Sequence, residues 1–130
     1  IGLWIEMNSI LIPFQIEILS RTGLGQGLID ITVYEVQDWF ILYPSMVQEK
    51  IGEEISHLSR AKPGSIFTEL SLDPSKPIRK QIPNPLPHRK AIDDAVFDAL
   101  GLTEEERREV YYAVAELVQM RLKKARSVGR

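Results

Sequence analysis

Six of the eight prolines in this 130-residue chain lie between positions 63 and 87. Proline fixes φ and removes a main-chain donor, so no long helix fits in this stretch. The prolines therefore divide the chain into residues 1–60, an irregular connector over residues 61–88, and residues 89–130, which we expect to form one compact domain. Within the connector, Ile66–Leu72 has the pattern of a brief strand. The rest of it is expected to run extended over the surface, partly as polyproline II.

The residues after the connector carry the start and stop signals of two consecutive helices. The first helix is predicted over Arg89–Leu100, and Gly101 is placed to end it in a left-handed conformation. Leu102 supplies the apolar contact that usually follows such an end. Thr103 then begins the second helix, and Glu106 three residues later completes a capping box. These signals predict a C-terminal helical hairpin.

The first 20 residues have apolar side chains at steps of three and four, which predicts a mostly buried helix over residues 3–20. Pro13 lies inside this pattern and is expected to kink the helix. The alternative is that Pro13 breaks the helix and that Phe14–Leu19 forms a short strand.

The period then changes from helical to alternating. Residues 21–27 are predicted to form a glycine-rich turn, and Leu28–Val36 a half-buried strand. An apolar segment, Trp39–Tyr43, follows the strand and leads to Pro44. Proline suits the first turn of a helix, and this helix is predicted to extend to Ser59. Together these patterns predict a helix-rich α+β fold with about four helices, a small strand element and the C-terminal hairpin.

The composition excludes several classes of function. The chain has no cysteine, which rules out disulfides and thiolate chemistry and suits a cytoplasmic protein. Its two histidines, His57 and His88, are 31 positions apart, and we predict no metal site. Charged residues interrupt the apolar run at the start of the chain, so no membrane span of about 20 residues is expected. The absence of an initial methionine is typical of a piece cut from a longer protein.

The charge is unevenly distributed. Residues 1–60 have 8 acidic and 3 basic side chains, whereas residues 61–130 have 10 acidic and 13 basic side chains. Any contact with phosphate is therefore expected mainly from the second half. The residues predicted to contact DNA are one arginine and one glutamine at the glycine loop and the basic residues around the last prolines: Arg21, Gln26, Lys76, Arg79, Lys80, Arg89 and Lys90.

Other candidate sites have a structural alternative. The glycines at 23, 25 and 27 invite a phosphate-loop interpretation, but they follow a predicted helix and precede a predicted strand, which favours a tight turn. Asp93, Asp94 and Asp98 lie on one short predicted helix, and two carboxylates at i and i+4 are able to bind a metal or act as an acid–base pair, although Arg89 and Lys90 nearby favour a salt-bridged surface. We predict no catalytic residue. The last helix has a wide apolar surface that serves the core alone or also an interface: Val114, Leu117, Val118, Met120 and Leu122.

Two blocks of the sequence resemble the C-terminal region of adenine-specific, amino-methylating DNA methyltransferases of restriction-modification and phage-defence type. The first block is Asn8-Ser9, then RTGLGQG over residues 21–27 and the segment Ile29–Val36. The second is PLPHR over residues 85–89, then DDAVFDALGLT over residues 93–103, ending in RLKKARSV over residues 121–128. The first resembles the junction between the target-recognition region and the methylase core, and the second resembles the tail that closes such enzymes.

The catalytic signature of that family is absent. The tetrad Asn/Asp-Pro-Pro-aromatic has only a partial counterpart in NPLP at residues 84–87, and no glycine-rich S-adenosylmethionine loop follows a strand. The resemblance therefore implies a non-catalytic recognition or assembly region that contributes to DNA binding. It also implies that S-adenosylmethionine, duplex DNA and the adjacent methylase core belong to the parent enzyme. The alternative is a protein–protein interaction module that docks, or forms a homodimer, through the C-terminal helix.

Overall fold

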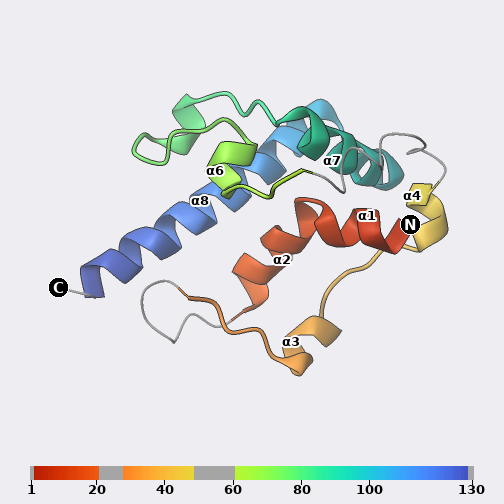
Figure 1. Ribbon diagram of the computed structural model, residues 1–130, viewed down its shortest axis with the longest axis horizontal. Coiled ribbons are helices and arrows are strands. Elements are labelled where there is room, and N and C mark those ends of the chain that lie inside the picture. The colour runs from red at the N-terminus through yellow and green to blue at the C-terminus, as the bar shows by residue number, and fades with distance from the viewer. Residues whose placement is uncertain (1, 21–27, 49–60, 129–130) are drawn as a thin grey trace.

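The computed structural model describes residues 2–20, 28–48 and 61–128, which are mostly helical (Figure 1). The helices are α1 (Gly2–Asn8), α2 (Leu11–Leu19), α3 (Val33–Gln37), α4 (Pro44–Gln48), α6 (Ile66–Glu69), η1 (Ile78–Lys80), α7 (Pro87–Leu100) and α8 (Glu104–Val128). No sheet is present within these ranges, so the helix-rich part of the predicted fold class is confirmed, whereas its strand element and its number of about four helices are wrong. The predicted glycine loop at residues 21–27, with Arg21 and Gln26, lies outside the described residues.

The C-terminal hairpin is confirmed in its details. Helix α7 begins at Pro87, two residues before the predicted start, and ends at Gly101, which has φ 70°. The Leu102 amide donates to the Phe97 carbonyl oxygen at 3.0 Å, as a left-handed helix end requires. The Thr103 amide donates to Glu106 Oε2 at 2.8 Å, while the Glu106 amide donates to Thr103 Oγ1 at 3.3 Å. These two bonds form the predicted capping box and begin α8.

The predicted kink at Pro13 is wrong, and so is the alternative strand over Phe14–Leu19. The helical segment is instead broken at residues 9–10, between α1 and α2. Pro13 lies in the first turn of α2, where main-chain amides have no partner within the helix. A proline there removes no helical hydrogen bond, and the helix continues through it.

Both predicted strands are also wrong. Residues 28–32 contain no strand beyond one bridge residue, Asp30, and α3 then begins where Thr32 and Glu35 form a capping box. In the connector, α6 replaces the brief strand, because Ser65 Oγ accepts the Thr68 amide and starts a helical turn. The predicted helix start at Pro44 is confirmed, and the rest of that helix, up to Ser59, lies beyond the described residues.

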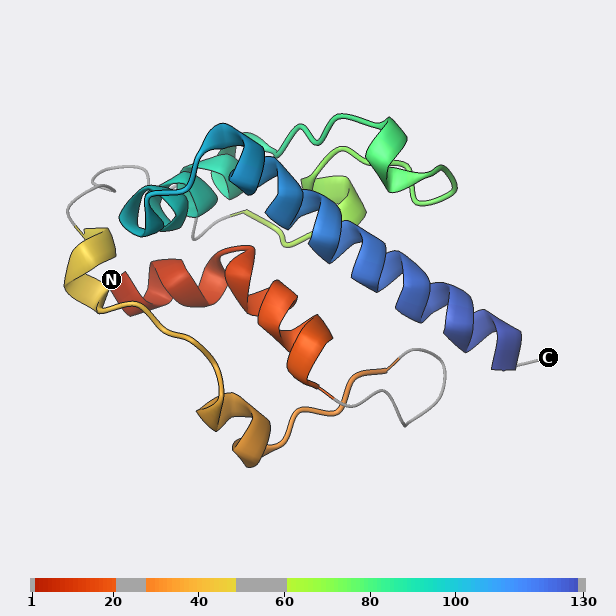
Figure 2. The same ribbon diagram turned by 180° about the vertical axis from the view of Figure 1, so that it is seen from behind.

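Two clusters of buried side chains form the core, and Leu11 packs against both. The first lies between α2, the connector, α7 and α8: Ile10, Phe67, Leu70, Leu72, Ile78, Phe97, Tyr111, Val114 and Ala115. The second lies between α1, α4 and α7: Ile5, Leu42, Val47, Ile92, Ala95 and Val96. Figure 2 shows how the long α8 runs past α7 and α2, with the connector beyond it. The hairpin is therefore the framework on which the first two helices pack.

Ion pairs join the N-terminal helices to the end of the hairpin. Arg121 Nη2 donates to Glu17 Oε1 at 2.6 Å, and Arg121 Nε also lies against the same carboxylate. Both side chains are largely buried, which makes this pair less exposed to screening by salt than a surface pair. The contact fixes α2 against α8.

Candidate functional site

The segment 28–43, which we call the arm, leaves the body of the protein and returns to it. Helix α3 forms its far end and lies apart from the other helices (Figure 1). No residue of α3 is buried. A five-residue helix is too short to be stable on its own, because nucleation costs more than so few hydrogen bonds return. The Thr32–Glu35 capping box supplies the local stabilisation that the sequence offers it.

The arm is anchored where it returns to the body. Gln15 on α2 both accepts from the Phe40 amide and donates to the Phe40 carbonyl oxygen. The Leu42 amide donates to Glu6 Oε1 on α1, and the Leu42 side chain is buried in the second core cluster. Helix α1 then packs against α4 so closely that a Cβ on Gly2 would lie 2.0 Å from the Pro44 carbonyl oxygen. The base of the arm is therefore held, while its far end projects.

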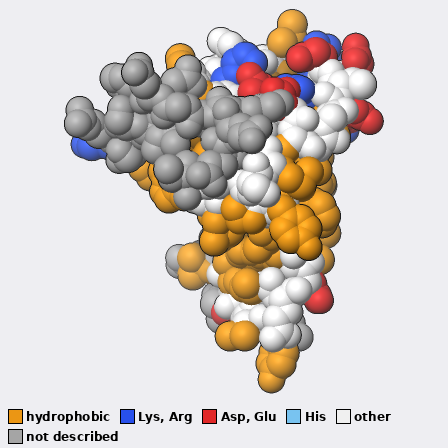
Figure 3. Space-filling model, turned by 90° about the vertical axis from the view of Figure 1, so that its right-hand side faces the viewer, with side chains coloured by type: hydrophobic (Ala, Val, Ile, Leu, Met, Phe, Trp, Pro, Cys, Tyr) orange, Lys and Arg blue, Asp and Glu red, His pale blue; other side chains and the backbone are white. Residues whose placement is uncertain are grey.

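The arm exposes apolar side chains to solvent along most of its length. They are Leu28, Ile31, Val33, Tyr34, Val36, Phe40, Ile41 and Tyr43. Val33 and Tyr34 on α3 are 74% and 79% exposed. Figure 3 shows hydrophobic side chains gathered over the lower half of the molecule, where Figure 1 places the arm. Exposed apolar side chains gathered in this way are typical of surfaces that contact another macromolecule.

The charged side chains of the arm are all acidic. Asp30, Glu35 and Asp38 lie among the apolar residues, and the sequence has no lysine or arginine between positions 28 and 48. Carboxylates repel a nucleic-acid backbone and an anionic lipid surface. The charge of the arm is therefore unfavourable for contact with either of those surfaces.

Arg79, one of the predicted DNA contacts, is engaged by its own chain. Its Nη1 donates to Glu109 Oε2 at 2.9 Å, and its Nε donates to Glu116 Oε1 at 3.2 Å. Its guanidinium also lies 5.5 Å from the centre of the Tyr112 ring. The neighbouring Glu109 carboxylate raises the pKa of Arg79. These contacts fasten η1 to α8, so the charge of Arg79 is largely balanced within the protein.

Arg89 is similarly engaged, in a mostly buried position. It donates to Glu69 Oε2 at 3.4 Å and to the Asn8 carbonyl oxygen, and His88 Nε2 lies 2.8 Å from the same Glu69 oxygen. Burial alone would raise the pKa of Glu69. The Gly64 amide, His88 and Arg89 together bring it below its ordinary value. The Arg89 side chain thus joins α7 to α6 and α1.

The lysines predicted to contact DNA lie on the surface and not in one group. Lys76 forms an exposed ion pair with Asp73 at 3.1 Å, and Lys90 pairs with Asp94 at 2.6 Å along α7. Lys80 is exposed at the end of η1. Each of these pairs is solvent-accessible, so it contributes little to stability.

The apolar residues predicted to form an interface on α8 are divided between core and surface. Val114 is fully buried in the first cluster, and Leu117, Val118 and Leu122 are partly buried. Met120 is 57% exposed. Most of this apolar surface therefore serves the core, against α2 and the connector.

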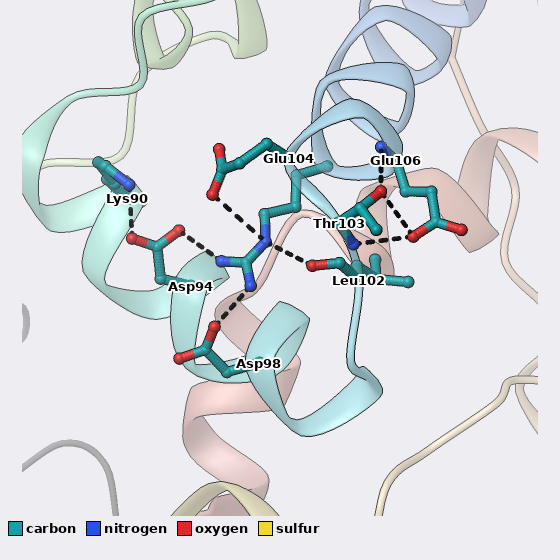
Figure 4. A network of polar contacts seen from close by, with 8 residues as sticks. Lys90, Asp94, Asp98, Leu102, Thr103, Glu104 and Glu106 are labelled. Atoms are coloured by element: carbon teal, nitrogen blue, oxygen red, sulfur yellow. Dashed lines mark hydrogen bonds and ion pairs between the residues drawn. The ribbon is translucent and has the colours of Figure 1, made fainter.

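Asp94 and Asp98 form part of a network that closes the hairpin (Figure 4). Arg107 Nη2 donates to Asp98 Oδ1 at 2.6 Å, Arg107 Nη1 to Asp94 Oδ1 at 3.3 Å, and Arg107 Nε to the Leu102 carbonyl oxygen at 3.0 Å. The guanidinium also lies over the Phe97 ring. The predicted salt-bridged surface is thus confirmed for Asp94 and Asp98 and wrong for Asp93, which is fully buried. Within residues 2–20, 28–48 and 61–128, no cluster of His, Asp and Glu is suited to hold a metal ion.

The sequence patterns did not predict that the arm exposes an apolar surface. They assigned residues 28–36 to a half-buried strand because their side chains alternate, which requires a partner strand. The Thr32-x-x-Glu35 spacing is a capping-box signal, and it was the sequence feature able to identify α3. None of the described helices is both long and apolar enough to span a bilayer.

Comparison of the chain with protein-family models, with curated proteins and with solved structures found no match.

Proposed function

We propose that this chain is a non-catalytic assembly region that docks on the surface of another protein through the apolar side chains of its arm. The observation that carries this proposal is the exposure of eight large apolar residues between positions 28 and 43, on a segment that buries little of itself. Burial of such side chains in an interface is favourable by about 25 cal/mol for each Å² of apolar surface. The short helix α3 would gain from a partner the packing that it lacks within the chain.

The partner surface that fits the arm combines an apolar groove with basic side chains at its edges. Asp30, Glu35 and Asp38 supply the complementary negative charge. Charge complementarity of this kind speeds association and selects the partner more than it adds affinity. The resemblance to methyltransferase C-terminal regions suggests the partner: the methylase core of an adenine-specific DNA methyltransferase. S-adenosylmethionine and the target adenine then belong to that core.

Under this proposal, contact with DNA contributes less to binding than docking through the arm does. Arg79 and Arg89, which have the most extensive contacts among the described residues predicted to bind DNA, are paired with carboxylates of the chain itself. A phosphate would have to displace those partners. The lysines at the surface are able to add weak, salt-dependent contacts in a complex that the arm has already formed.

A binding experiment tests the proposal. The purified chain is mixed with the separately purified core of an adenine-specific DNA methyltransferase that lacks its own C-terminal region. Sedimentation velocity then measures the complex. We expect binding by the wild-type chain and at least a tenfold loss for Val33→Asp combined with Tyr34→Asp, because charge would be buried without a partner.

Ile82→Asp is the matched control, since Ile82 is 81% exposed but lies in the connector. This variant is expected to bind like the wild type. Equal affinity of the arm variant and the control would contradict docking through the arm. Tight, salt-dependent binding of duplex DNA by the isolated chain, with no binding to the core, would favour the recognition role instead.

A further inference from the structure

Two buried carboxylates accept hydrogen bonds at two positions that we call joints. One joint is the break between α1 and α2, and the other is the point at which the arm returns to the core. Asp93 of α7 accepts the Ile10 amide through Oδ1 at 2.7 Å, and Glu6 of α1 accepts the Leu42 amide through Oε1. Both side chains are almost completely buried. The second oxygen of each carboxyl, Asp93 Oδ2 and Glu6 Oε2, has no hydrogen-bond partner among the described residues. An unpartnered oxygen in a buried carboxyl is unfavourable when the group is charged.

The first joint is the break between α1 and α2. Arg89 and Asp93 are one helical turn apart on α7 and contact opposite sides of the break: Arg89 donates to the Asn8 carbonyl oxygen at the end of α1, and Asp93 accepts the Ile10 amide just before α2. A cation at the C-terminus of one helix and an anion at the N-terminus of the next match both helix dipoles. The pair thereby fixes the α1–α2 break on α7.

The second joint attaches the arm. Glu6 lies on α1, next to the break, and its partner Leu42 is the residue at which the arm returns to the core. Release of α1 from α7 would therefore disturb the base of the arm as well. The two carboxyls therefore stabilise consecutive contacts: Asp93 attaches the α1–α2 break to α7, and Glu6 attaches the arm to α1.

The groups around Asp93 belong to α7, to α8 and to the break between α1 and α2. Arg89 Nη1 lies 3.6 Å from Asp93 Oδ1 on the same helix, and the Tyr111 phenol faces it from α8. Arg89 also contacts Glu69 of α6, so its charge is shared between two carboxylates. Burial raises the pKa of Asp93 to about 7, against the opposing effects of Arg89, the Ile10 amide and a hydrogen bond from the Tyr111 phenol. Burial also raises the pKa of Tyr111, which keeps the phenol neutral.

Glu6 has a simpler environment. Burial raises its pKa, and the Leu42 amide opposes that effect. Both carboxyls are thus displaced in the same direction from their ordinary values, and for the same physical reason.

We propose that Asp93 and Glu6 form a pH-sensitive latch: when both are protonated, α1 and the arm stay attached to α7, and when they ionise, both joints open more often. The sign follows from proton linkage. An open joint exposes the carboxyl to water, where it ionises near its ordinary value, so the closed state binds more protons and is weakened as the pH rises. The latch is independent of what the arm binds.

Linkage also sets the size of the effect at the Asp93 joint. A closed-state pKa of about 7 and an ordinary value of 3.8 mean that the open carboxyl is already ionised at pH 6. The equilibrium constant for opening then rises by about tenfold between pH 6 and pH 8. A group with an unperturbed pKa would produce no change over that range.

Amide hydrogen exchange, read by NMR and corrected for the intrinsic effect of pH on exchange, tests the latch in the full chain. We expect the protection of the Ile10 amide to fall by about tenfold between pH 6 and pH 8, and that of the Leu42 amide to fall as the pH rises through the raised pKa of Glu6. Asp93→Asn should abolish the pH dependence at Ile10, because the amide oxygen still accepts the hydrogen bond but has no proton to lose. Glu6→Gln should abolish the fall in Leu42 protection that accompanies ionisation of Glu6. The control variant Asp94→Asn removes a partly exposed carboxylate one position away and should show the same pH dependence at Ile10 as the wild type.

Constant protection of the wild-type Ile10 amide over this range would overturn the proposal. So would a pH dependence that persists in Asp93→Asn. If either variant fails to fold, as judged by circular dichroism, titration of the ¹³C-labelled carboxyls in the wild type decides the matter. Asp93 should then ionise near neutral pH, and ionisation below pH 5 with Ile10 still protected would refute the latch.

Discussion

Replacement of Gly101 by alanine isolates the conformational cost of the turn between α7 and α8. Gly101 has φ 70°, in the left-handed region, and its amide donates to the Asp98 carbonyl oxygen at 3.1 Å. A Cβ placed on it would meet no atom within 4 Å. The substitution therefore adds no steric clash and removes no hydrogen bond. It changes only the intrinsic preference of the backbone.

The expected magnitude follows from two opposing effects. The left-handed conformation costs an L-residue about 1–2 kcal/mol. Alanine also restricts the unfolded chain, which returns about 0.4–1 kcal/mol of stability. We therefore expect Gly101→Ala to lower the free energy of unfolding by about 1 kcal/mol, and to lower Tm by roughly 3–5 °C for a chain of this size.

Urea and thermal unfolding, followed by circular dichroism at the helix band, measure both quantities. Gly101→Asn is the matched comparison, because asparagine tolerates the left-handed region better than alanine does, and it should lose less stability. A variant with alanine that is as stable as the wild type would refute the left-handed helix end. A loss above about 3 kcal/mol would instead refute the open space around position 101.

Three further predictions concern the hairpin and the connector. Phe97→Ala should lower the free energy of unfolding by about 3–5 kcal/mol in urea titrations, because Phe97 is fully buried and meets the Tyr111 ring edge-on; a loss below about 1 kcal/mol would contradict that packing. Arg107→Ala should cost about 1–2 kcal/mol, less in 1 M salt than in low salt, since its contact with Asp98 is partly exposed to screening; a cost independent of salt would assign the effect to packing. Glu69→Gln should destabilise the protein at pH 7 and have less effect as the pH falls below 4.5, because the lowered pKa of Glu69 gives stability that protonation removes; pH-unfolding curves of the two proteins that stay parallel would refute this.

The sequence predicted the hairpin because its signals are local. Gly101 ends one helix and the Thr103–Glu106 box begins the next, and each depends only on residues within one turn. Pro44 as a helix start belongs to the same class. Signals of this kind need no knowledge of the rest of the fold.

The arm and the α1–α2 break were not predictable in the same way. An alternating apolar pattern favours a strand only if another strand pairs with it, and the described ranges provide none for residues 28–32. The break at residues 9–10 depends on Arg89 and Asp93, which are about 80 positions away in the sequence. Asp93 was recognised only as part of an acidic surface. Its burial follows from tertiary contacts that no local pattern records.

The contact between Glu17 and Arg121 has a consequence for the protein during its synthesis. These two residues are 104 positions apart, and α2 finds its packing surface on α8. At about 5–20 residues per second, the first helices leave the ribosome roughly 5–20 s before the surface that covers them. During that interval the apolar side chains of α1 and α2 lack the packing surface that α8 provides. We expect a chaperone to bind them until α8 has been synthesised.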